Sequence, residues 1–147
     1  MVQVLEAADG NLDPATLTRH DARHFALENP QGMTVDPLSG DLFILDSAGP
    51  RILQVAPESD GGFDNARISV IDLRTTGLVE PRGVAYDPAT GHLHVLSPAE
   101  QALYELTLSG QVVARRDLTE FGLANPRAIV FAPSSDLTDD PSQTSLY

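Results

Sequence analysis

The chain has 147 residues, a formal net charge of −12 and a sequence pI of about 4.4. All nine basic residues are arginines, and the absence of cysteine excludes disulfides and thiolate chemistry. Scattered arginines on an acidic chain offer no basic face to a nucleic-acid backbone, so we expect no nucleic-acid partner. We also expect no membrane insertion, because no apolar run approaches the roughly 18 residues of a spanning helix. No signal peptide is visible; an extracellular or periplasmic location is only slightly favoured.

Short apolar runs predict β-strands along the whole chain, because eleven prolines and eleven glycines leave little room for long helices. The first run, VQV from Val2, precedes a second strand that ends in the segment RHDARH, residues 19–24. Four strand types, which we name A to D, follow in order: GMTVD (32–36), DLFILD (41–46), RILQVA (51–56) and ARISVIDL (66–73). The same four types recur after residue 80.

An internal repeat organises these strands. NPQGMTVDPLSGDLFILDS from Asn29 aligns without a gap with EPRGVAYDPATGHLHVLSP from Glu80, 51 residues later, and NPRAIVFAPSSD from Asn125 begins a third copy after another 45. A four-stranded repeat of this length is typical of a propeller blade. We therefore predict an all-β fold, a β-propeller of four-stranded blades with about three blade equivalents. We expect residues 1–147 to form a single partial β-propeller domain, with repeats at about 1–28 (partial), 29–79, 80–124 and 125–147 (partial).

The connection between strands A and B is predicted to be a tight hairpin. It reads Asp-Pro-x-x-Gly, with Asp36 and Asp87 at its start and Gly40 and Gly91 at its end. Aspartate caps such a turn, proline fixes its φ angle, and glycine accepts a positive φ. We expect both glycines in left-handed or related conformations.

The aligned segments resemble the NHL-repeat type of β-propeller, with its Pro-x-Gly opening, its aspartate before a glycine turn and an aliphatic strand ending in aspartate. Similar repeats occur in the wider six-bladed group that includes gluconolactonase- and regucalcin-like enzymes. The resemblance implies a six-bladed ring. The sequence departs from the pattern at Ser97, where the strand-B aspartate is expected, at Ala128, where glycine is expected, and in an acidic insertion before TSLY.

The chain holds strands C-D, then A-B-C-D twice, then A and part of B. Two arrangements are open. The chain is a fragment of a longer six-bladed propeller, because repeats cannot bury their faces alone. Alternatively, if the chain is complete, a homodimer closes the ring, with each terminal C-D pair joining the A-B pair of its partner.

The segment RHDARH resembles a zinc motif, with His20 and His24 four residues apart. We reject zinc there because Asp21 is the aspartate of the repeat, equivalent to Asp72 and Asp117, and because ligands four apart in an extended strand lie roughly 13 Å from one another. His92 and His94 form an H-x-H pair in strand B. His94 aligns with Phe43, so we expect it to pack between blades rather than bind metal.

Three acidic segments are candidate calcium loops: DGNLD (9–13), ESDGGFDN (58–65) and DLTDD (136–140). The first has the opening of an EF-hand loop, but Pro14 replaces the required glycine and His20 the required glutamate. We expect no cofactor and no metal site, with weak Ca²⁺ binding by these loops left open.

The D–A and B–C loops lie on one face of a propeller, and loops on a rigid scaffold carry function disproportionately. Five residues there form the candidate ligand-binding set: Gln31, Asp46, Arg82, Ser97 and Arg127. Arg82 and Arg127 occupy equivalent positions and suit bidentate binding of a carboxylate or phosphate. The alternative is that each arginine pairs with a neighbouring acid and braces the repeat.

Two functions follow. The first is a non-enzymatic repeat scaffold that binds a protein or small ligand on its loop face, with no catalytic residues. The second is a metal-dependent hydrolase or lactonase of the six-bladed type, whose metal would need oxygen ligands at the channel mouth. Asn29, Asp46, Glu80 and Asn125 are its only candidates in this chain.

Overall fold

The computed structural model describes residues 1–6, 9–136, 138, 140 and 144–147, and within them the chain forms four antiparallel sheets. Two sheets have four strands, in the orders β3-β4-β5-β6 and β7-β8-β9-β10, and two have two strands, β1-β2 and β11-β12. The strands are β1 (Val2–Glu6), β2 (Leu12–Arg19), β3 (Pro30–Val35), β4 (Leu42–Asp46), β5 (Arg51–Ala56), β6 (Arg67–Asp72), β7 (Gly83–Asp87), β8 (His92–Ser97), β9 (Ala102–Leu106), β10 (Val112–Asp117), β11 (Phe131–Pro133) and β12 (Thr144–Leu146).

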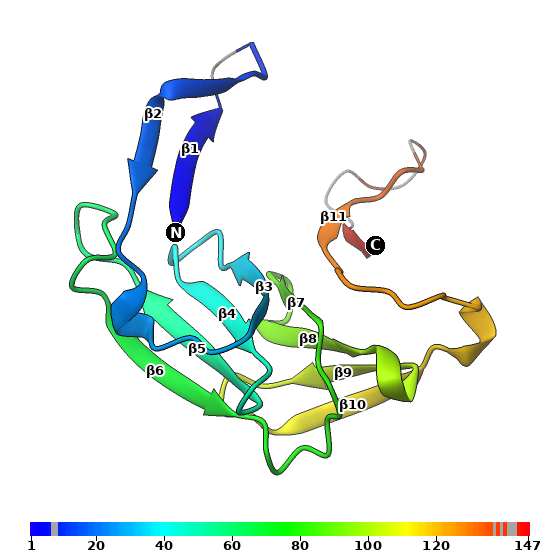
Figure 1. Cartoon of the computed structure of the whole chain (residues 1–147). Coiled ribbons are helices and arrows are strands. Elements are labelled where there is room, and N and C mark those ends of the chain that lie inside the picture. Colours follow the sequence, from blue (N-terminus) through cyan, green and yellow to red (C-terminus); the bar gives the residue numbers. More distant parts are fainter. Residues whose placement is uncertain (7–8, 137, 139, 141–143) are drawn as a thin grey trace.

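The sheets follow one another along an open arc, with β1-β2 at one end and β11-β12 at the other (Figure 1). Each four-stranded sheet is a meander whose neighbours in sequence are neighbours in space, which is the build of a propeller blade. The predicted fold is confirmed: the chain is all-β, with two complete blades, a C-D half-blade and an A-B half-blade.

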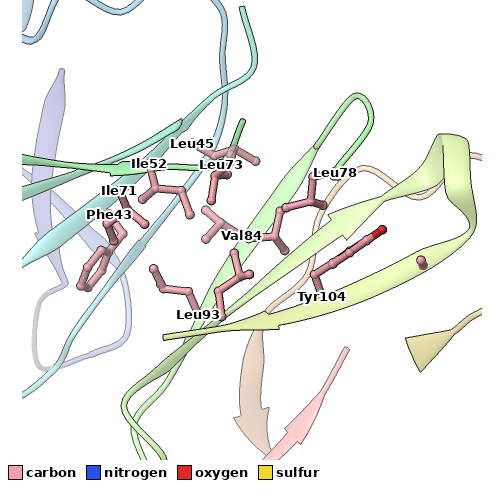
Figure 2. Close-up of a cluster of buried hydrophobic side chains, with 12 residues drawn as sticks. Phe43, Leu45, Ile52, Ile71, Leu73, Leu78, Val84, Leu93 and Tyr104 are labelled. Carbon is pink, nitrogen blue, oxygen red and sulfur yellow. The ribbon is translucent and has the colours of Figure 1, made fainter. Parts of the chain in front are cut away.

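The main core lies between the two complete blades (Figure 2). Strand β4 shows how one strand serves two boundaries. Phe43 and Leu45 point into the core shared with the second blade, whereas Leu42 and Ile44 point into a smaller cluster on the side of β1-β2. All five residues of β4 are buried, as in a strand that is covered on both faces.

The inner strands of neighbouring blades approach closely at the glycine of the repeat. A Cβ atom on Gly83 would lie 3.3 Å from the Cα of Ala128 and 3.4 Å from the carbonyl oxygen of Arg127. On the preceding boundary, Tyr86 N–H donates to Thr34 Oγ1 at 3.1 Å. The Pro-x-Gly opening therefore lets adjacent A strands pack backbone to backbone.

The predicted A–B hairpins are confirmed. Gly40 and Gly91 have φ angles of 77° and 72°. The carboxylates of Asp36 and Asp87 accept the N–H groups of Leu38 and Ala89, both at 2.9 Å. The two turns are thus built alike.

The segment RHDARH differs from its expected extended form, because β2 ends at Arg19 and a 3-10 turn covers Arg23–Phe25. Asp21 caps this turn by accepting the N–H of Arg23 at 3.0 Å, as Asp72 does for Arg74 at 2.9 Å. The strand assignment was wrong here because a side-chain cap of this kind ends a strand as effectively as glycine or proline. The equivalence of the repeat aspartates holds.

Candidate functional site

The D–A and B–C loops lie together at one edge of each blade. In the first complete blade, Ser47 N–H donates to the Asn29 carbonyl at 3.0 Å, and Leu73 N–H donates to the Pro50 carbonyl at 2.9 Å. These backbone bonds fix the loops of the first blade, next to Gln31 and Asp46.

Asp46 at the end of β4 anchors this loop edge from inside. Its side chain is fully buried, and its carboxylate accepts the N–H groups of Asn29 at 2.8 Å and Glu28 at 3.2 Å. The Nη2 of Arg51 lies 2.9 Å from Asp46 Oδ2 and also donates to the carbonyl of Ala26. Burial alone would raise the pKa of Asp46, but the Asn29 N–H and the Arg51 guanidinium outweigh it and hold that pKa below its ordinary value.

Ser97 holds the same place in the second blade with a different chemistry. Its hydroxyl lies 2.6 Å from the carbonyl oxygen of Val79 and 2.8 Å from Glu100 Oε2. Glu100 Oε2 also accepts the Val79 N–H at 3.1 Å, and Glu100 Oε1 accepts the hydroxyl of Tyr104 at 2.9 Å. Val79 is equivalent to Glu28, so Glu100 supplies the acceptor that Asp46 supplies in the first blade. Sequence reasoning missed Glu100.

Arg82 crosses the boundary between the two complete blades. Its Nη1 donates to Gln31 Oε1 at 2.9 Å, and its Nη2 lies 3.5 Å from Glu80 Oε2. Gln31 Nε2 in turn donates to Asn29 Oδ1 at 2.8 Å. The structure therefore brings Gln31 and Arg82 together. Arg82 is braced by two partners, Gln31 of the neighbouring blade and Glu80, two residues before it in the chain.

Arg127 occupies the equivalent position at the next boundary and is exposed. Within the part of the chain that the structure describes, its guanidinium makes no hydrogen bond or ion pair. Between Arg82 and the loop before Arg127 lies a hollow of about 400 Å³, mostly polar, lined by Glu80, Arg82, Pro98, Ala99, Gln101, Leu123 and Asn125. Arg127 does not line this hollow, but its guanidinium has open donors that are suited to bind a carboxylate or phosphate.

The histidines lie in separate environments. His94 is 7% exposed and packs edge-on against Phe131, with ring centroids 5.0 Å apart, which confirms its inter-blade position. His92 Nδ1 lies 2.8 Å from Glu105 Oε1. His20 Nε2 bonds Gln3 Oε1 at 3.1 Å, whereas His24 lies against Phe25.

No three His, Cys, Asp or Glu side chains gather into a metal-binding group among the described residues. Asp9 and Asp13 cap local turns in the first acidic segment, and Asp60 does so in the second. Residues 137 and 139 of the third acidic segment lie outside the described residues. Calcium binding and the hydrolase alternative stay predictions. In the same described part of the chain, no helix has the length and apolar character needed to cross a bilayer.

Of three similar solved structures, the first two, with TM-scores above 0.5, support the fold. A chain in the crystal structure of the nidogen/laminin complex is similar over 88% of this chain and 44% of its own length, with 18% identity and a TM-score of 0.63. Hydrazine synthase from Kuenenia stuttgartiensis is similar over 73% and 27%, with 19% identity and a TM-score of 0.53. A streptogramin B lyase structure is similar over 86% and 37%, with 17% identity and a TM-score of 0.49.

The chain thus spans less than half the length of these structures. No family model matches it, and no curated protein matches it. At such identities the likeness concerns the fold alone, which is a β-propeller built from four-stranded blades.

Proposed function

We propose that this chain is part of a non-enzymatic, six-bladed propeller of the NHL type, which binds an acidic group of a protein or small ligand on its loop face. The observation that carries the proposal is the pair of equivalent arginines in successive D–A loops, of which Arg82 lines the polar hollow. Arg82 is held across a blade boundary by Gln31, and Arg127 is exposed one blade further on.

The five predicted residues divide into two roles. Gln31, Arg82 and Arg127 contact the ligand, because their polar ends reach the loop surface. Asp46 and Ser97 are positioning residues, because both are fully buried and fix the D–A loops through hydrogen bonds. The arginines supply charge-assisted bidentate bonds, each of which contributes about 1.5–3 kcal/mol.

A protein partner has a precedent at the level of the fold. The nidogen/laminin structure is a protein–protein complex, and one of its chains resembles this one. Propellers present many loops side by side on one rigid face, which suits protein recognition as well as capture of small anions. A homodimeric ring would double the number of arginines on that face.

Calorimetric titration with citrate and with inorganic phosphate tests the proposal. We expect binding of at least one of the two, weakened roughly 100-fold in the Arg82→Ala/Arg127→Ala double variant. Arg74→Ala is the matched control, because Arg74 is an exposed loop arginine paired with Asp72 outside the hollow. Absence of binding by the unchanged chain, or equal weakening by the control, would contradict the proposal.

A further inference from the structure

The polar hollow lined by Arg82 and Glu80 lies at the boundary between the second complete blade and the A-B half-blade, which we call the second boundary. The D–A loops before β7 and β11 and the B–C loop after β8 surround it. Its volume of about 400 Å³ is near the lower end of the range for small-molecule sites. A ligand that fits this hollow is therefore small.

The equivalent place at the first boundary, between the two complete blades, is closed by its own side chains. Gln31 Nε2 donates to Asn29 Oδ1 at 2.8 Å, and Asn29 Nδ2 donates to Ser47 Oγ at 2.8 Å. Gln31 Oε1 in turn accepts a hydrogen bond from Arg82 Nη1 at 2.9 Å. Donors and acceptors pair along this series, so these groups need no ligand to satisfy them.

Two exchanges in the repeat leave the second boundary open. Glu80 stands at the position of Asn29, and Pro98 stands at the position of Ser47. A carboxylate has no N–H group to donate and a proline side chain has no oxygen to accept, so the bond from Asn29 to Ser47 has no counterpart there. The polar groups around the hollow are left to face solvent or a ligand.

One cation and one anion line the hollow, and they are loosely paired. Arg82 Nη2 lies 3.5 Å from Glu80 Oε2, whereas the two atoms of the ion pair between Arg74 and Asp72 lie 2.6 Å apart. In the part of the chain that the structure describes, Glu80 has no other partner, and the guanidinium of Arg82 otherwise bonds only Gln31. Both charges therefore have open hydrogen-bonding positions for a ligand.

Two carboxamides, Gln101 and Asn125, line the same hollow and are exposed. Neither side chain makes a hydrogen bond within the described residues. A carboxamide both donates and accepts hydrogen bonds, so these two side chains can contact either a negative or a positive group of a ligand.

The backbone of three lining residues has an uncommon conformation. Glu80, Gln101 and Asn125 have φ angles of 47°, 47° and 53°, and they are three of the four non-glycine residues with positive φ in the described part of the chain. At Gln101 this conformation ends the 3-10 turn Pro98–Glu100, whereas Glu80 and Asn125 end no helical turn. Positive φ is uncommon for residues other than glycine and asparagine, and residues held in it gather at ligand-binding sites.

The apolar part of the lining is small. It consists of Pro98, Ala99 and Leu123, and Leu123 is 45% exposed. A short aliphatic group that covers Leu123 would remove apolar surface from water, which favours binding.

We propose that this hollow binds a free α-amino acid with an aliphatic side chain. Such a ligand carries a carboxylate and an ammonium group on one carbon, and the hollow offers a guanidinium beside a carboxylate. Arg82 donates to the ligand carboxylate, Glu80 accepts from the ligand ammonium, and Leu123 contacts the aliphatic side chain. The inference rests on the proposed function, in which Arg82 binds an acidic group, and it adds a partner for Glu80.

A ligand with a single charge matches the hollow less well. A simple anion pairs with Arg82 but brings a like charge towards Glu80, and an amine without a carboxylate pairs with Glu80 but brings a like charge towards Arg82. The hollow therefore favours a ligand that carries both charges.

NMR titration of the isotope-labelled chain with L-leucine tests the proposal, with the side-chain amide resonances of Gln101 and Asn125 as reporters of the hollow. We expect both resonances to shift. N-acetyl-L-leucine lacks the ammonium group and L-leucinamide lacks the carboxylate, so each should bind at least roughly 10-fold more weakly than leucine. Absence of leucine binding, or equal affinity for leucine and either derivative, would overturn the proposal. This comparison needs no substitution in the chain.

A Glu80→Gln variant tests the role of the carboxylate. It should weaken leucine binding roughly 10-fold or more and leave citrate binding undiminished, because citrate has no ammonium group for Glu80 to accept from. Glu120→Gln is the matched control, because Glu120 is an exposed acid of the neighbouring D–A loop outside the hollow. Unchanged leucine binding in Glu80→Gln, or equal weakening in the control, would overturn the proposal.

These outcomes separate the inference from the proposed function. Citrate binding that depends on Arg82, without any leucine binding, would overturn the amino-acid site alone. Leucine binding that is lost in Glu80→Gln, without any binding of citrate or phosphate, would support the amino-acid site and contradict the wider anion-binding surface.

Discussion

The D–A loop is held by Asp46 in the first complete blade and by Ser97 with Glu100 in the second. Substitutions that convert the first network into the second test whether the two are equivalent. In Asp46→Ser the first blade acquires the serine of the second blade without its glutamate. The variant loses acceptors for the N–H groups of Glu28 and Asn29 and the ion pair with Arg51. Hydrogen bonds to charged groups contribute about 1.5–3 kcal/mol each, and the partners of the buried Asp46 are partly exposed, so we expect a loss of about 3 kcal/mol.

The second substitution should restore part of that loss. Gly49 is the position equivalent to Glu100, and a Cβ atom there would meet nothing within 4 Å. In Asp46→Ser/Gly49→Glu the new carboxylate can accept the Glu28 N–H, as Glu100 accepts that of Val79, and can pair with Arg51. We expect recovery of about 1.5 kcal/mol.

Urea unfolding followed by circular dichroism measures both changes, since the midpoint should shift while the slope stays constant. The 3 kcal/mol loss corresponds to a fall in Tm of roughly 6–12 °C for a chain of about 150 residues. Asp46→Ser/Gly49→Gln is the control, because glutamine has the shape of glutamate without its charge, and it should recover less. A double variant no more stable than Asp46→Ser would refute the equivalence of the two networks.

Further predictions concern the boundary and the turns. His94→Phe should raise stability by about 1 kcal/mol, because it removes a buried Nδ1 that has no hydrogen-bond partner among the described residues. Burial lowers the pKa of His94, so its neutral form favours folding, and the stability of the wild type should fall as pH drops through about 6.5, which thermal melts from pH 8 to 5 would show. His94→Phe should reduce that fall. Gly91→Val should lower stability by about 1–2 kcal/mol, because its φ is 72°, whereas Gly49→Val, without a positive φ, should not; equal melting of the two would contradict this.

Much of the fold could be predicted from the sequence, because the same strand and turn patterns recur at equivalent positions of each repeat. Strand C of the first blade, Arg51–Ala56, has the predicted bounds, and the hairpin glycines have the predicted sign of φ. The alignment of His94 with Phe43 also placed a histidine correctly in an inter-blade core. Hydrophobic periodicity and turn-forming residues act over a few positions, so they can be recognised from the sequence alone.

The site was less predictable, because its contacts join residues far apart in the chain. The bond from Arg82 to Gln31 spans 51 residues and depends on how two blades dock. The replacement of Asp46 by a Ser97–Glu100 pair was signalled in the sequence only by the missing aspartate. Which residue supplies the lost acceptor is decided by the 3-10 turn at Pro98–Glu100, which brings the carboxylate back to the loop.

We propose that equivalent arginines of successive blades form one anion-binding surface on the loop face. The most direct test is NMR of the arginine side-chain Nε–H resonances during a citrate titration. We expect the Arg82 and Arg127 resonances to shift together with one binding constant, while that of Arg74, paired with Asp72 away from the hollow, stays unchanged. Shifts confined to Arg74 and other outer arginines, or no shift at Arg82 and Arg127 at saturating citrate, would contradict it.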